Sequence, residues 1–298
     1  MPNSKAHMPT APTPLRGRSQ GAIHPHWVAL LAAALAIPFG SVAAAQSPSG
    51  PPPAVDSGGV PDMPQPQVAN PALPSPDDKE KVTLRGTPKD ILKEQEAIWT
   101  SPVRIRDRNL AYLVPLGLAT TVAITADHQV MSSGRLDDPS LNSHASTASN
   151  GLLGGFVVAP VIIYGLGHIH HDDHATETGI LAGEAMVDSL VVDEVLKAAT
   201  MRERPTLDAA KGKFFQRSVG LDSSFPSTHS IIAWSSAAVI ASEYPGPMTK
   251  LTAYGLATGL SMTRILARQH FPSDVLVGSA VGWLVGRYVF HKHHNDDY

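Results

Sequence analysis

The sequence predicts an all-α protein whose main domain is a six-helix bundle. From residue 108 onward the chain holds six apolar segments of helical length, and Gly, Ala and Ser are frequent in all of them. Small side chains let helix backbones approach closely, as in tightly packed bundles. No segment of roughly 20–50 residues repeats, which excludes a solenoid. The expected helices cover approximately residues 108–126, 150–167, 176–200, 227–243, 249–267 and 273–290.

The composition excludes several classes of function. The 298 residues carry a formal charge of −3, which argues against a nucleic-acid-binding protein. Cysteine is absent, so disulfides, zinc-thiolate sites and iron–sulfur clusters are excluded. The mean hydropathy of −0.04 includes a polar N-terminal third, so this value does not exclude membrane helices.

The N-terminal region has the pattern of a secretory signal peptide. Arg16 and Arg18 precede an apolar run at residues 27–39, and small residues follow up to Ala45. The pattern predicts cleavage after Ala45, so that residues 1–45 form the signal peptide. An uncleaved membrane anchor is the alternative, because the apolar and small residues together extend over 19 positions, but Pro38 interrupts them.

Two further segments precede the bundle domain, which we assign to residues 108–298. Residues 46–86 are rich in Pro, Ser, Gly and Asp and contain few large apolar residues, so we expect a disordered linker there. Residues 87–107 are expected to form a short amphipathic helix, with Asp90 as its N-cap, and a connector.

Three short motifs stand at helix ends in the last third of the chain. The first closes the third expected helix, the second opens the fourth, and the third joins the fifth to the sixth. This order brings all three motifs to one end of the bundle. The motifs are K-x6-R-P with Lys197, Arg204 and Pro205, P-S-x-H with Pro226, Ser227, Thr228 and His229, and R-x5-H-x3-D with Arg264, His270 and Asp274.

The residue types in these motifs suit a phosphate group. A phosphoryl group in transfer spreads negative charge over its oxygens, so it needs fixed cations and N–H donors around it. Lys197, Arg204 and Arg264 supply three cations, and the planar guanidinium of arginine can bind two phosphate oxygens at once. The helix that begins after Ser227 presents unpaired N–H groups to an anion. Each feature alone is common on protein surfaces, but their combination with two histidines indicates a phosphate site.

The three motifs, in this order, resemble those of the type 2 phosphatidic acid phosphatase and vanadium haloperoxidase superfamily. The resemblance implies the helical bundle of that superfamily and a phosphatase that needs no metal or other cofactor. It also implies that His270 is the nucleophile, that Asp274 orients the His270 imidazole, and that His229 is the general acid and base. The phosphate-binding residues that it implies are Lys197, Arg204, Ser227, Thr228 and Arg264.

The chain departs from the family pattern at two positions. Thr228 stands where glycine is usual, and its side chain adds bulk beside the expected phosphate. Thr263 stands where serine is usual, which keeps a hydroxyl group at this position.

A second set of metal-ligand residue types lies outside the motifs, in one loop and in the C-terminal tail. The set comprises His168, His170, His171, Asp172, Asp173 and His174 in the loop, and His291, His293, His294 and Asp296 in the tail. These residue types allow metal binding. A solvated polar loop and tail is the alternative interpretation, because no i, i+4 histidine pair with a glutamate base is present.

The leading hypothesis is a metal-independent phosphatase acting on phosphomonoesters, with a lipid phosphate or a polyprenyl diphosphate among its candidate substrates. A vanadate-dependent haloperoxidase is an alternative, because vanadate mimics phosphate in transfer and the same residues could hold it. A non-catalytic membrane or metal-binding protein is a third hypothesis, supported only by the histidine-rich loop. The expected partners are a phosphorylated small molecule or lipid and a membrane, without nucleic acid.

The predicted signal peptide places the protein in the periplasm or outside the cell, and attachment to a membrane surface is compatible with both. If all six helices crossed a bilayer, the active site would face the cytoplasm, whereas membrane relatives usually act on the outer side. Several apolar runs have 17–18 residues, slightly short of the ~20 needed to span. An integral membrane protein is the alternative, because residues 151–167 are apolar throughout.

Overall fold

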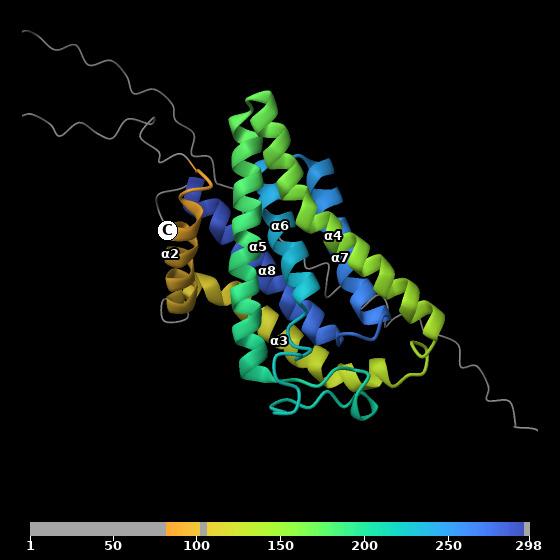
Figure 1. The fold of residues 1–298 in the computed structure, drawn as a ribbon. Coiled ribbons are helices and arrows are strands. Elements are labelled where there is room, and N and C mark those ends of the chain that lie inside the picture. Colours follow the sequence, from red (N-terminus) through yellow and green to blue (C-terminus); the bar gives the residue numbers. More distant parts are fainter. Residues whose placement is uncertain (1–81, 102–105, 295–298) are drawn as a thin grey trace, which may run out of the picture. The chain divides into compact units, whose positions relative to one another are not determined.

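The computed structural model describes residues 82–101 and 106–294, which belong to one compact unit of the chain (Figure 1). The predicted signal peptide and the linker up to residue 81 lie outside the described residues. Residues 82–86, which we assigned to the linker, form a turn in which the Gly86 amide donates to the Thr83 carbonyl at 2.9 Å. The chain is therefore ordered slightly earlier than expected.

The described residues form seven α-helices, one 3-10 turn and no β-strand, which confirms the all-α class. The α-helices are α2 (Thr87–Thr100), α3 (Asp107–Met131), α4 (Pro139–His170), α5 (Asp173–Thr200), α6 (Thr228–Glu243), α7 (Pro247–Leu266) and α8 (Pro272–His294), and the 3-10 turn is η3 (Asp208–Ala210).

Two helix starts differ from the expectation. Asp90 is not the N-cap of α2, because the helix already begins at Thr87. Asp90 lies in the first turn instead, where its carboxylate interacts favourably with the positive end of the helix dipole. Helix α4 begins at Pro139 rather than near residue 150. The Asp138 carboxylate accepts the Ser140 amide at 2.8 Å, and this cap starts the helix in a polar segment that an apolar pattern does not detect.

Helix α6 lies at the centre of the bundle and packs against α4, α5, α7 and α8. One apolar cluster joins α6 to α4 and α7 and includes Phe156, Trp234 and Leu260. Another joins α6 to α5 and α8 and includes Leu181 and Val239. The core is thus built around one helix that is buried along most of its length.

The α6 and α8 backbones approach each other closely at glycines of α8. A Cβ atom added to Gly282 would overlap the Ile231 carbonyl oxygen, so a larger residue requires the backbones to move apart. This packing brings the start of α6 beside the first turn of α8, where the Ser227 amide donates to the Asp274 carbonyl at 3.0 Å. This hydrogen bond joins the second motif to the third.

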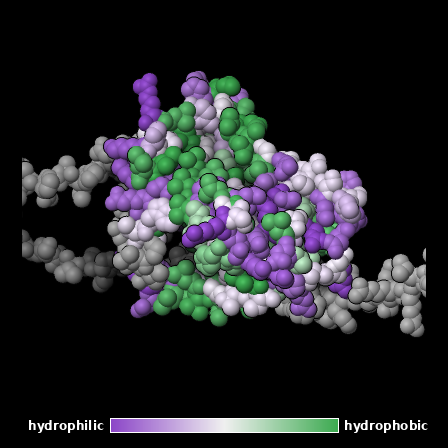
Figure 2. All heavy atoms as spheres, turned by 60° about the horizontal axis from the view of Figure 1, so that its bottom comes forward, coloured by the Kyte–Doolittle hydropathy of each residue, from purple (hydrophilic) through white to green (hydrophobic). Residues whose placement is uncertain are grey.

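Helices α3 and α4 are long and apolar enough to cross a membrane, over Asn109–Met131 and Pro139–His170. Their apolar windows are 0% and 17% buried within the protein. Exposed apolar side chains include Tyr112, Leu118, Val122, Val161, Ile162 and Ile169. On the face drawn in Figure 2, polar side chains gather over the middle and apolar side chains form patches around them. Apolar surface of this extent indicates a lipid or protein partner.

A candidate phosphate site at one end of the helices

The three motifs meet where α5 and α7 end and where α6 and α8 begin, at the bottom of Figure 1. Lys197 lies in the last turn of α5, Arg264 in the last turn of α7, and Asp274 in the first turn of α8. The charges of Arg264, Lys197 and Arg204 all act on the His229 imidazole. The structure therefore brings the expected cations and both motif histidines into electrostatic reach of one another.

His270 is buried and held in one tautomer. Its Nδ1 lies 2.7 Å from the Ser224 carbonyl oxygen. A carbonyl can only accept a hydrogen bond, so Nδ1 carries the proton and Nε2 keeps its lone pair. Burial, together with Arg264 and Arg204, lowers the pKa of His270 well below its usual value. The imidazole is consequently neutral and nucleophilic at Nε2.

Asp274 lies too far from the His270 imidazole for the direct hydrogen bond that was expected to orient the ring. Its Oδ2 lies 3.8 Å from His270 Nδ1 and accepts the Phe271 amide at 2.7 Å. Its Oδ1 accepts from Arg202 Nη1 at 2.5 Å. Burial raises the pKa of Asp274 to about 6, although Arg202 opposes the shift. The acceptor that selects the His270 tautomer is therefore the Ser224 carbonyl, and Asp274 contributes a nearby negative charge.

Arg202 is a residue of this region that the motifs did not reveal. Its side chain is 1% exposed, and its Nη2 donates to Asp127 of α3 at 2.7 Å while its Nη1 holds Asp274. The guanidinium carbon lies 4.1 Å from the centre of the Phe271 ring. Arg202 therefore joins α3 to the start of α8 under the site. Only burial distinguishes it from Arg204, and burial is not visible in the sequence.

His229 faces the site from the first turn of α6. Its Nε2 lies 3.1 Å from Asn150 Oδ1 of α4, a contact that the motifs did not predict. Burial first, and then the charge of Arg264, lowers the pKa of His229 to about 3. Without a bound anion, the imidazole is therefore neutral at physiological pH.

The Thr228 side chain is held by hydrogen bonds to neighbouring residues of the site. Its hydroxyl donates to Asp193 Oδ2 at 2.7 Å and also contacts the Lys197 ammonium group. The Lys197 Nζ lies 2.9 Å from the same Asp193 oxygen. The side chain that replaces the usual glycine is therefore turned toward Lys197. Asp193 becomes a carboxylate neighbour of the site that the motifs did not indicate.

The two arginines of the motifs differ in their partners. Arg264 is buried and donates through Nη1 to Ser149 at 2.9 Å, but its buried Nε has no hydrogen-bond partner among the described residues. Arg204 is partly exposed and binds Asp222 at 2.8 Å. A buried guanidinium N–H without an acceptor is costly, so an anion bound beside Arg264 would satisfy a donor that the protein leaves open.

Ser227 precedes α6 as its N-cap residue, as expected, but its side chain makes no capping hydrogen bond. Its amide is used by the Asp274 carbonyl. The next amides of the helix, beginning with that of Thr228, lack carbonyl partners within the helix and carry the positive end of its dipole. These amides add donors for an anion.

The histidine-rich loop and the tail approach each other at Glu243, whose Oε2 lies 3.7 Å from Nε2 of His294 in the tail. His174 pairs with Glu243 at 3.0 Å, and His168 stacks on Tyr164. His293 instead contacts Glu94 and Glu184, far along the chain from the loop. Asp296 lies outside the described residues. Among the described residues, the loop and the tail together do not supply three metal-ligand atoms within 4.8 Å of one another.

Comparison with known proteins agrees with the resemblance seen in the motifs. Residues 178–298 match the family model of the PAP2 superfamily, and this segment contains all three motifs. No curated protein matches the chain. The chain is similar to the crystal structure of a transmembrane PAP2-type phosphatidylglycerolphosphate phosphatase from Bacillus subtilis, with 20% identity and a TM-score of 0.44 over 72% of this chain and 96% of that chain. The match of residues 178–298 to the PAP2 superfamily model confirms the resemblance.

Proposed function

We propose that the protein is a metal-independent phosphatase that hydrolyses phosphomonoesters, lipid phosphates among them, through a phosphohistidine on His270. The observation that carries the proposal is the hydrogen bond from His270 Nδ1 to the Ser224 carbonyl at 2.7 Å. This bond leaves the Nε2 lone pair free beside three cations. Lys197, Arg204 and Arg264 offer the positive charge that a metal ion supplies in other phosphatases.

In the first step the substrate phosphate binds to the three cations and to the amides at the start of α6. The lone pair of His270 Nε2 attacks phosphorus in line, the N–P bond forms, and the bond to the leaving oxygen breaks. His229 gives its proton to the leaving alkoxide. The positive charge that develops on the His270 ring is stabilised by Asp274, 3.8 Å away. In the second step His229 takes a proton from water, the water oxygen attacks phosphorus, and His270 regains its electron pair.

His229 must take up its proton when the substrate binds. In the free site the pKa of His229 is about 3, because the imidazole is buried and faces Arg264. A phosphate dianion brings opposite charge into the same space, and this raises the pKa of His229. Substrate binding and protonation of the general acid are therefore coupled.

Helix α4 supports a lipid phosphate as substrate and membrane association of the protein. Its polar first part carries Ser149 and Asn150, which contact Arg264 and His229. Its apolar part, from Gly151 to His170, has 20 residues and a length of about 30 Å, which matches the hydrocarbon core of a bilayer. If this part crosses the membrane, the site lies at the depth of the phosphate head groups. Export across the membrane stays a prediction.

The experiment that tests the mechanism compares two histidine variants on two substrates. We expect His270→Ala to abolish turnover and phosphoenzyme formation with every leaving group. His229→Ala should lose roughly 10²–10⁴-fold in rate with an alkyl phosphate, the usual contribution of general acid catalysis. Its loss should be much smaller with p-nitrophenyl phosphate, because nitrophenolate departs without a proton.

Two results would contradict the proposal. An acid-labile phosphoenzyme that persists in His270→Ala would assign the nucleophile to another residue. Complete loss of activity in excess EDTA while the chain stays folded, with recovery on adding magnesium or zinc, would show that the reaction depends on a metal. Phosphate release from a panel of lipid and soluble phosphoesters, measured in the same preparation, would then define the substrate class.

A further inference from the structure

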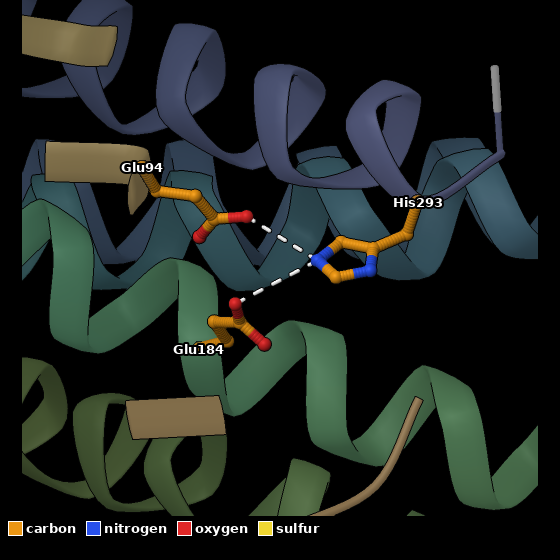
Figure 3. A group of neighbouring side chains, drawn as sticks. All are labelled: Glu94, Glu184 and His293. Carbon is orange, nitrogen blue, oxygen red and sulfur yellow. Dashed lines mark hydrogen bonds and ion pairs between the residues drawn. The ribbon is translucent and has the colours of Figure 1, made fainter. Parts of the chain in front are cut away.

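A second group of buried ionisable side chains lies between the middle of α5 and the C-terminal end of α8. Glu94 comes from α2, Glu184 from α5 and His293 from α8, and the three side chains point toward one another (Figure 3). Glu184 precedes Lys197 by 13 residues on α5, a rise of about 20 Å. His293 follows Asp274 by 19 residues on α8, a rise of about 28 Å. The group is therefore separate from the phosphate site.

The spacing of the donor atoms suits a metal ion. His293 Nε2 lies 3.3 Å from Glu94 Oε1 and 3.7 Å from Glu184 Oε1. The three ligand atoms all lie within 4.8 Å of one another. Ligands about 2.1 Å from a tetrahedral zinc ion lie about 3.4 Å apart, close to the first two distances.

The carboxylates of this group lack the hydrogen bonds that burial demands. Glu184 is 1% exposed, and neither of its oxygens has a hydrogen-bond partner among the described residues. Glu94 Oε2 and Asp188 Oδ2 also lack a partner there. Both carboxylates contact the same Nε2 atom of His293, which carries at most one N–H and cannot satisfy them both. Buried carboxylate oxygens left without donors are costly, and a cation placed among them removes this cost.

The negative net charge of the ionised group also favours binding of a cation. Glu94, Glu184 and Asp188 carry three negative charges when ionised, and Lys292 supplies one positive charge 3.1 Å from Glu94 Oε1. With neutral His293 the net charge is −3 + 1 = −2, which one divalent ion balances.

We propose that Glu94, Glu184 and His293 bind one divalent transition-metal ion, for which Zn²⁺ is the best fit. One imidazole and two carboxylates are ligands that Zn²⁺ accepts in tetrahedral geometry, with Asp188 or a water molecule as the fourth. The ion would connect three helices and hold α2 against α5 and α8. The role of the ion would be structural. It would be separate from the proposed phosphatase reaction, which needs no metal at the phosphate site.

The test uses the full chain, without a histidine tag, stripped with EDTA and then loaded with Zn²⁺. We expect about one Zn²⁺ per chain after desalting, measured by elemental analysis. At a free Zn²⁺ concentration 100-fold above Kd, the melting temperature should rise by roughly 5–10 °C. Mg²⁺ at the same concentration should cause no shift, because an imidazole ligand and few oxygens suit it poorly.

Glu184→Gln and His293→Gln should both lose the bound Zn²⁺ and the shift in melting temperature. A melting curve and a circular dichroism spectrum recorded without metal should show that Glu184→Gln is folded, so that its loss of binding cannot be attributed to misfolding. The matched control is Glu243→Gln. Glu243 is also buried and contacts His174 at 3.0 Å and His294 at 3.7 Å, but among the described residues these three do not form a group whose ligand atoms all lie within 4.8 Å of one another. This variant should keep one Zn²⁺ and the full shift.

Three results would overturn the proposal. The parent chain could hold no stoichiometric Zn²⁺ after desalting, in which case the group is a proton-sharing polar network. Glu184→Gln could bind Zn²⁺ as tightly as the parent chain. Glu243→Gln could lose the ion, which would place the site among other histidines.

Discussion

Arg202 provides the sharpest test of how the phosphate site is supported. We expect Arg202→Met to destabilise the protein strongly, although Arg202 makes no contact with the proposed substrate. Arg202 is 1% exposed, and it neutralises Asp127 at 2.7 Å and Asp274 at 2.5 Å, which are 2% and 0% exposed. Methionine fills most of the volume but leaves both carboxylates buried without their cation.

The magnitude follows from the burial of all three partners. Removing one partner of a buried ion pair costs about 3–5 kcal/mol, and two carboxylates lose their partner here, so we expect the upper part of this range. For a domain of this size, each kcal/mol lowers the melting temperature by about 2–4 °C. The expected decrease is therefore about 8–20 °C.

The matched control is Arg204→Met, two residues further along the chain. Arg204 pairs with Asp222, which is 78% exposed, and an exposed pair contributes about 0–1 kcal/mol. Arg204→Met should therefore melt within a few degrees of the parent chain while losing phosphatase activity. Adding Asp127→Asn to Arg202→Met should restore part of the stability, because it removes one uncompensated charge. Melting curves of the four chains in the same detergent test this. If Arg202→Met and Arg204→Met melt at the same temperature, the buried network does not support the site.

Three further predictions concern packing, the unusual threonine and pH. Gly282→Ala should destabilise the protein by about 1–3 kcal/mol, because the new Cβ meets the Ile231 carbonyl, whereas Gly183→Ala, with open space around it, should be neutral or stabilising in thermal melts. Thr228→Gly should free Lys197 from the threonine hydroxyl and lower KM for a phosphomonoester, and an unchanged or higher KM would contradict this. Sulfate, a dianion at all pH values used, should bind with uptake of one proton, because it raises the low pKa of His229. Its affinity should therefore increase as pH falls from 8 to 5, and calorimetry that finds the same Kd throughout would refute the coupling.

The sequence by itself was sufficient for the local features. Apolar runs predicted the helices, and K-x6-R-P, P-S-x-H and R-x5-H-x3-D placed Lys197, His229 and His270 at helix ends that share one end of the bundle. Such features depend on neighbouring residues, because helix formation and helix termination are set by side chains within a few positions. The roles of these residues in catalysis stay predictions that the histidine variants test.

Only the tertiary structure decided which distant groups complete each site. Arg202 and Arg204 are chemically identical and two residues apart, yet one lies in the interior and the other near solvent. The Ser224 carbonyl that selects the His270 tautomer is a backbone atom, which carries no sequence signal. Glu94 and His293 are 199 positions apart and meet only because α2 packs beside the end of α8. Burial and long-range contacts depend on how whole helices pack, and for that reason no local pattern in the sequence could predict them.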